Sequence, residues 1–127
     1  MGPRNFREYP VWKEAVDYAT HIYQVTDKMP WFEKKGLCDQ LQRAAVSISS
    51  NIAEGAARTT NVDFSHFLTY ALGSAFEVET QLLIARNVGY LDENHYWELI
   101  VKVSSIERQL NGLIATVRGK SQGQGQG

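Results

Sequence analysis

The chain has 127 residues, of which 43% are hydrophobic and 21% are charged, as expected for one globular domain. Thirteen lysines and arginines against fourteen acidic residues give a net charge of −1, which excludes a polycation that coats nucleic acid or anionic membranes. The single cysteine, Cys38, excludes an intrachain disulfide and a cysteine zinc cluster, and it predicts a reducing, cytoplasmic setting.

Proline positions and apolar periodicity predict helices throughout the chain. Prolines stand at positions 3, 10 and 30 only, so residues 31–127 can form long helices without a break. Apolar residues recur at steps of three and four, and nowhere do they alternate with the period of a strand. We therefore predict four helices, at about residues 11–29, 34–57, 62–88 and 93–118.

Most of these helices have boundary signals. Pro10 suits the first turn of the first helix, and Pro30 predicts a stop after it. One of the polar residues 59–61 can cap the third helix, and Gly89 predicts its left-handed end. Asp92 is the expected cap of the fourth helix. Because the connections are short, the predicted fold class is all-α, an antiparallel up-down-up-down four-helix bundle.

The expected domain organisation has three parts. Residues 1–10 form an N-terminal arm, residues 11–118 form the four-helix bundle, and residues 119–127 form a disordered Gly/Gln tail. The tail is predicted to be disordered because it has no apolar group to bury and much backbone entropy to lose.

The second and third helices carry more apolar surface than one core needs. About 140° around the second helix from the core position Leu41, small residues recur at steps of four, three and four. The third helix is apolar over about half of its circumference, against the narrower stripe of an ordinary surface helix. We expect a closed homo-oligomer whose interface includes Val46, Ser50, Ala53, Ala57 and Phe76. Alternatively, the third helix buries a wide arc inside one bundle, and the small residues merely favour helix.

The second helix also carries a polar motif, formed by Arg43, Ser47, Asn51 and Glu54. One interpretation is a hydrogen-bonded seam that fixes the register of helices or subunits. The other is a recognition surface in which arginines meet phosphates. Glu54 and Arg58 are four residues apart, in the order that favours a helical ion pair. The candidate nucleic-acid contacts are Arg43, Arg58, Arg108 and Arg118.

No residue set predicts catalysis, a metal or a cofactor. A metal pair in a helical bundle needs two carboxylate–histidine motifs, whereas Asp63-Phe-Ser-His66 occurs once. Cys38 has no recognisable catalytic partner, and no glycine-rich phosphate loop is present. No segment has the roughly 18 consecutive apolar residues of a membrane span, so we expect no membrane association. We therefore expect a protein that is not an enzyme.

The sequence resembles a family of small four-helix-bundle proteins encoded in the intervening sequences of bacterial 23S ribosomal RNA genes. The resemblance covers roughly residues 5–118, and the block from Ser47 to Gly55 is its most specific part. The matching segments are Asn5-Phe-Arg-Glu, Val11-Trp-Lys, Leu37, Gln40, Arg43-Ala-Ala-Val-Ser-Ile, Asn51-Ile-Ala-Glu-Gly55, Phe64, Phe67-Leu68, Ala71-Leu-Gly-Ser74, Glu77, Glu79-Thr-Gln-Leu82 and Gly89-Tyr-Leu91.

The resemblance implies a bundle that assembles as a homopentamer and has no enzymatic activity. A related bundle is the accessory protein of diversity-generating retroelements, which contacts a reverse transcriptase and nucleic acid. Relatives that bind nucleic acid tend to be basic, whereas this chain has one basic and six acidic residues between positions 59 and 101. The leading interpretation is a homo-oligomeric scaffold that binds RNA or a ribonucleoprotein. The alternative is a protein–protein interaction module without nucleic-acid binding.

Overall fold

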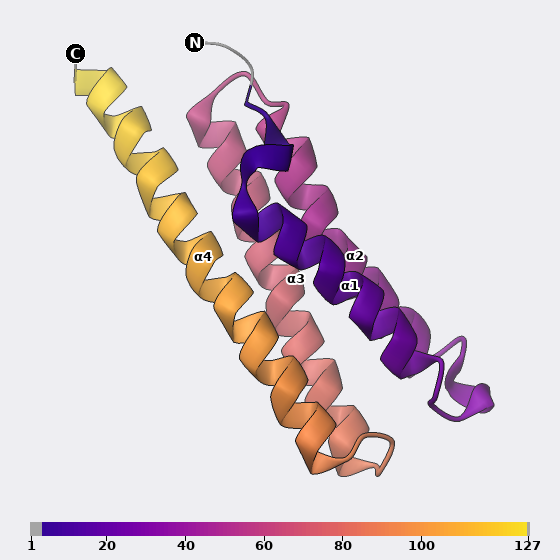
Figure 1. The fold of residues 1–127 in the computed structure, drawn as a ribbon. Coiled ribbons are helices and arrows are strands. Elements are labelled where there is room, and N and C mark those ends of the chain that lie inside the picture. Colours follow the sequence, from indigo (N-terminus) through magenta and orange to yellow (C-terminus); the bar gives the residue numbers. More distant parts are fainter. Residues whose placement is uncertain (1–3, 127) are drawn as a thin grey trace.

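The structure, a computed structural model, describes residues 4–126, with side chains as far as Lys120. Its elements are a 3₁₀ turn η1 (Phe6–Glu8), α1 (Pro10–Thr26), a second 3₁₀ turn η2 (Trp31–Glu33), α2 (Leu37–Ala56), α3 (Asn61–Asn87) and α4 (Glu93–Gln126). The four α-helices run along a common long axis (Figure 1). The described residues contain no strand, and the predicted all-α four-helix bundle is confirmed.

The core is built from the apolar stripes that the periodicity predicts. One large side chain from each helix illustrates this, since Ile22, Leu41, Phe64 and Leu99 are all 0% exposed. Helix α3 packs on both α2 and α4, whereas α1 packs mainly on α2 and less on α4. Consequently α3 has a helix on each side and still keeps a face that no described element covers. None of the helices in residues 4–126 combines the length and the apolar character needed to cross a bilayer.

Three predicted helix boundaries are confirmed. The Thr60 hydroxyl accepts a hydrogen bond from the backbone N–H of Asp63 at 3.1 Å, which caps α3. Gly89 ends α3 with a left-handed φ of +88°. Asp92 Oδ1 accepts from the backbone N–H of His95 at 2.8 Å and caps α4.

Other boundaries differ from the prediction. Helix α1 ends at Thr26, three residues early, and the buried Thr26 hydroxyl donates to the Ile22 carbonyl at 2.9 Å. Helix α2 begins only at Leu37 instead of about residue 34, because a turn that ends at the non-helical Gly36 takes up residues 34–36. The helix α4 continues to Gln126 instead of ending near residue 118, since neither proline nor a left-handed residue stops it in the described chain. Residues 1–3 of the predicted arm and Gly127 of the predicted tail lie outside the described residues.

A pair of glutamates connects α3 and α4 outside the core. Partial burial, the neighbouring Glu79 carboxylate and a hydrogen bond with Glu79 raise the pKa of Glu107 from about 4.5 to about 7. The folded chain therefore holds an extra proton between these two pH values. The unfolded chain loses that proton at a lower pH than the folded chain does. The free energy of unfolding therefore falls as the pH rises from about 4.5 to 7.

The variant Glu107→Gln should remove this pH dependence. We expect the variant to be more stable than the parent by about 1 kcal/mol at about pH 8, and nearly unchanged at about pH 5, after allowance for solvent screening. Urea unfolding at fixed protein concentration measures both values. Glu77→Gln, an exposed glutamate of α3, is the control and should have the same effect at both pH values. An equal effect of Glu107→Gln at both pH values would contradict the assignment.

Candidate self-association and nucleic-acid surfaces

Two residues of the polar motif on α2 join a hydrogen-bonded contact with α3. Ser47 and Ser74 place their hydroxyl oxygens 2.9 Å apart across the α2–α3 boundary. The Asn51 amide donates to the Ser47 carbonyl and to its hydroxyl, both at 2.8 Å. This arrangement favours the interpretation of Ser47 and Asn51 as a seam that fixes the register of two helices.

The other two residues of the motif lie on the outer surface. Arg43 has a side chain that is 80% exposed, and its Nε lies 2.9 Å from Asp39 Oδ2. Glu54 is exposed, and the expected Glu54–Arg58 ion pair is not formed. Helix α2 ends at Ala56, so Arg58 lies in the following loop, where the four-residue helical spacing no longer applies. Its guanidinium instead lies 3.8 Å from Asp63 Oδ2.

The small residues of α2 form an accessible row, which we call the α2 seam: Val46, Ser50, Ala53 and Ala57. Val46 is 40% exposed, Ser50 and Ala57 are exposed, and Ala53 is half-buried. The row extends for about 17 Å at 1.5 Å per residue. Short side chains in such a row let the backbone of another helix come close.

Helix α3 has a second uncharged surface on its outer side. We call it the α3 stripe, and its eight residues are Val62, Thr69, Gly73, Phe76, Thr80, Leu83, Ile84 and Asn87. Every one of them is exposed, and none carries a charge. Phe76 and Ile84 are 49% and 47% exposed. A row of this kind extends for about 38 Å along the helix, nearly its whole length.

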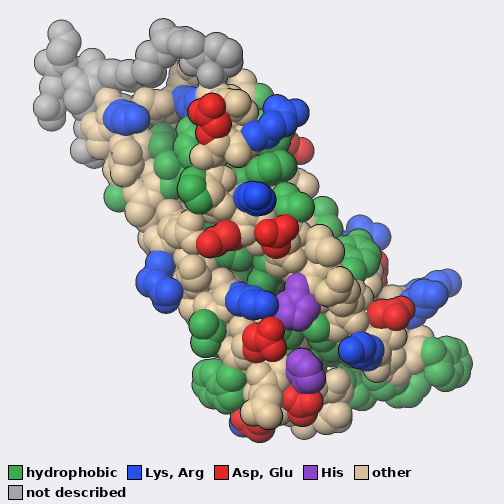
Figure 2. All heavy atoms as spheres, in the orientation of Figure 1, with side chains coloured by type: hydrophobic (Ala, Val, Ile, Leu, Met, Phe, Trp, Pro, Cys, Tyr) green, Lys and Arg blue, Asp and Glu red, His purple; other side chains and the backbone are tan. Residues whose placement is uncertain are grey.

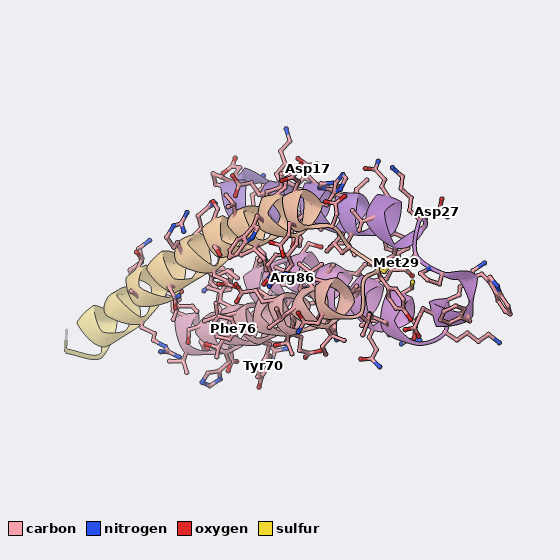
Figure 3. All side chains as sticks on the ribbon, turned by 90° about the horizontal axis from the view of Figure 1, so that it is seen from below. Asp17, Asp27, Met29, Tyr70, Phe76 and Arg86 are labelled. Atoms are coloured by element: carbon pink, nitrogen blue, oxygen red, sulfur yellow. The ribbon has the colours of Figure 1, made fainter. Side chains whose placement is uncertain are left out.

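The α2 seam and the α3 stripe are separate surfaces. Ser74 points toward α2, because its hydroxyl meets Ser47. Phe76 follows two residues later, a rotation of about 200°, and therefore points away from α2. Tyr70 and Phe76 lie on α3 at the side of the bundle opposite Asp17 of α1 (Figure 3). Phe76 and the four α2 residues, which the sequence predicts as parts of an oligomer interface, therefore lie on two separate surfaces.

The opposite face of the bundle has a different character. Figure 2 shows the face formed by α1 and α4, where acidic, basic and histidine side chains are interspersed. Lys102 lies 3.2 Å from Glu98, and Gln109 donates to Glu14 across the two helices. The charged face of α1 and α4 therefore contrasts with the uncharged α3 stripe.

The four arginines proposed as nucleic-acid contacts do not form one cluster. Arg43 lies on α2, and Arg108 and Arg118 lie on α4, a helix that does not pack on α2 in the described structure. Arg118 donates to the Thr69 hydroxyl at 3.4 Å. Arg58 lies over the Phe67 ring, 5.5 Å from its centroid. Arg43, Arg58 and Arg118 thus each contact a different neighbouring side chain of the same subunit.

The structure reveals a hollow that the sequence did not indicate. It has a volume of about 800 Å³ and lies where α2 ends and α3 begins, with the N-terminal arm and the segment of α4 between residues 113 and 120 as further walls. Arg58 lines it together with Arg4, Asn61 and Lys120. Neither periodicity nor a motif connects these residues, which come together only through the tertiary packing of the arm and α4.

The side chains that could bind a metal ion are dispersed over the described residues. No three His, Cys, Asp or Glu side chains in residues 4–120 are placed to hold a metal ion. Cys38 is buried, and its thiol donates to the Thr26 carbonyl at 3.6 Å. Burial raises the pKa of Cys38, which disfavours the reactive thiolate. His66 is exposed on α3.

Comparison with known proteins identifies the family of this chain and a solved structure with a similar fold. The family of the 23S rRNA-intervening sequence protein matches residues 7–112. A crystal structure of a protein of unknown function, from the S23 ribosomal protein family of Bacteroides thetaiotaomicron, is similar with a TM-score of 0.76 and 24% identity. The match covers 82% of this chain and 97% of that one, and it supports the fold alone. None of the curated proteins matches this chain.

Proposed function

Because the chain belongs to the 23S rRNA-intervening sequence protein family, we propose that it is a non-enzymatic helical scaffold that assembles into a homo-oligomer. The observation that carries this proposal is the α3 stripe, which is exposed and uncharged along nearly the whole helix. Its exposed apolar side chains, Val62, Phe76, Leu83 and Ile84, are the kind of surface that marks sites of association. The α2 seam supplies a second surface, on a neighbouring helix, that another backbone can approach closely.

The separation of the two surfaces determines the kind of assembly. If the α2 seam of one subunit binds the α3 stripe of the next, each contact joins two different patches. Contacts of this head-to-tail type form a closed ring when the repeated rotation between neighbours brings the last subunit back into contact with the first. The resemblance to the family suggests a ring of five, and we adopt the homopentamer as our proposal.

A ring would act by presenting several copies of one surface to a partner. Multiple copies of a weak site raise the overall affinity by effective concentration. An RNA or ribonucleoprotein partner is favoured by the arginine and lysine side chains around the hollow. A basic protein partner is the alternative, since α3 has acidic residues beside the stripe, such as Glu77. We place the scaffold in the cytoplasm, which suits a chain with one buried, free cysteine.

The mass of the protein in solution tests the proposal. Light scattering at low and moderate salt should give the mass of several subunits, with little change between the two salts, because apolar contacts are not screened. A single-chain mass at all protein concentrations would contradict self-association. A partner protein that remains bound after nuclease treatment would favour the protein–protein alternative over RNA.

A further inference from the structure

The hollow at the end of the bundle combines an apolar interior with a rim of cations. Its interior includes the fully buried Phe64 and the nearly buried Val117. Arg4, Arg58 and Lys120 line it, and none of its described lining residues is an aspartate or glutamate, although Asp63 outside the hollow lies 3.8 Å from Arg58. In a chain of net charge −1, this is a local concentration of positive charge at a concave site.

The Arg4 guanidinium is held in a fixed position in the hollow. It donates to the Arg58 carbonyl at 2.6 Å, to the Ala56 carbonyl at 3.4 Å and to Asn61 Oδ1 at 2.5 Å. It also lies over the Phe64 ring, 4.6 Å from the centroid. None of the ion pairs formed by the described residues involves Arg4. The charge is thus positioned by neutral groups and is not neutralised by a carboxylate.

Asn61 provides an unpartnered donor in the same hollow. The residue is 8% exposed, and its Nδ2 atom is buried and has no hydrogen-bond partner among the described residues. Because a guanidinium can only donate, the Asn61 oxygen must face Arg4, and the NH₂ group must point elsewhere. A buried N–H donor without an acceptor is unfavourable, so an acceptor supplied by a ligand would be favourable here. Asn61 is also the first residue of the 27-residue helix α3, where the helix dipole favours an anion.

We propose that this hollow binds the phosphate of a nucleotide. The phosphate would lie between Arg4, Arg58 and Lys120, because phosphates are matched by arginine and by helix N-termini. It would accept from Asn61 Nδ2 once the amide, which is buried in the hollow, turns toward it. The half-buried rings of Phe6 and Tyr9 line the same hollow and offer surfaces on which a base can stack. A volume of about 800 Å³ is in the range of small-molecule sites. The same chemistry has two sources, a free nucleotide or the phosphorylated end of an RNA.

This inference goes beyond the scaffold function and does not depend on assembly. All residues that line the hollow come from one chain, although Ala53 and Ala57 belong both to the hollow and to the α2 seam. The variant Val46→Glu alters the seam at a residue that does not line the hollow. A single-chain Val46→Glu variant should therefore still bind, so failure of the scaffold proposal and failure of this one are distinguishable.

The main test is the variant Asn61→Asp, measured by calorimetric titration with adenosine 5′-monophosphate. The carboxylate has the same shape as the amide but repels the phosphate and pairs with Arg4, so we expect binding to weaken by about tenfold or more. The variant should be as stable as the parent, because an acidic residue in the first turn of a helix is favourable. Thermal unfolding of the variant checks this point and should show no loss of stability.

Two further variants distinguish a specific effect of the hollow from a general effect of losing one positive charge. Lys120→Gln should weaken binding by about threefold, as expected for an exposed cation at the rim. Arg7→Gln is the matched control, since Arg7 belongs to the same arm but lies over the Phe6 ring and does not line the hollow. Arg7→Gln should bind like the parent. Equal weakening by Arg7→Gln and Asn61→Asp would overturn the proposal.

The source of the phosphate is determined by comparing three probes. Binding of adenosine 5′-monophosphate supports a free nucleotide, whereas binding of a 5′-phosphorylated RNA but not of the same RNA with a 5′-hydroxyl supports an RNA end. In either case the Asn61→Asp variant must bind more weakly than the parent. The absence of binding by all probes, or binding that Asn61→Asp leaves unchanged, would overturn the proposal.

Discussion

Replacing Val46 with glutamate is expected to break the oligomer into single chains while the four helices remain. Val46 is 40% exposed in one subunit, so the single chain tolerates a carboxylate at this position. In the assembly the same carboxylate would be buried against the uncharged α3 stripe without a partner, which costs several kcal/mol. Light scattering should show the mass of one chain, and far-ultraviolet circular dichroism should keep the helical signal of the parent.

The control for this change is Val16→Glu. Val16 is 36% exposed on α1 and belongs to neither surface, so the chemistry and the exposure of the substitution are matched. We expect this variant to keep the mass of the parent. An assembled Val46→Glu variant, or dissociation by Val16→Glu, would show that the interface lies elsewhere.

Replacing Gly55 with alanine is expected to destabilise the bundle by about 2 kcal/mol. Gly55 lies inside α2 where α3 passes closely, and a Cβ atom there would lie 2.6 Å from Phe67 Cβ and 3.0 Å from Phe64 Cδ1. Phe64 is fully buried, so neither neighbour moves away without disturbing the contact between α2 and α3. Urea unfolding should show a lower free energy of unfolding.

The control is Gly112→Ala, a glycine of α4 whose added Cβ would meet no described atom within 4 Å apart from its chain neighbours and the backbone of its own helix. Since alanine favours helix over glycine, this variant should be more stable by about 0.5–1 kcal/mol. Both substitutions replace glycine with alanine, but the changes expected in the free energy of unfolding have opposite signs. Stabilisation by Gly55→Ala as well would contradict the close approach of α2 and α3.

The sequence predicts most of the fold because local signals and packing agree. Residues of the apolar stripes, such as Ile22 and Leu82, are buried, and the caps at Thr60, Gly89 and Asp92 lie where their chemistry predicts. The errors occur where no regular pattern applies. The turn between α1 and α2 takes up residues that the periodicity had assigned to both helices.

The candidate surfaces are only partly predictable. Rotation by 100° per residue places the α2 seam opposite the core, but it does not show that Phe76 lies on another side of the bundle. The helical spacing of Glu54 and Arg58 predicts an ion pair that the helix end at Ala56 prevents. Arg4 and Lys120, near opposite ends of the chain, come together only through tertiary packing, which periodicity does not describe.

The central claim is that the α2 seam of one subunit binds the α3 stripe of the next. The most direct test is to mix two variants, Val46→Glu and Phe76→Glu, each of which has one damaged and one intact surface. Each variant alone should be a single chain by light scattering, and an equimolar mixture should form a heterodimer of twice that mass. A mixture that stays monomeric, or a Phe76→Glu variant that associates by itself, would contradict the head-to-tail contact.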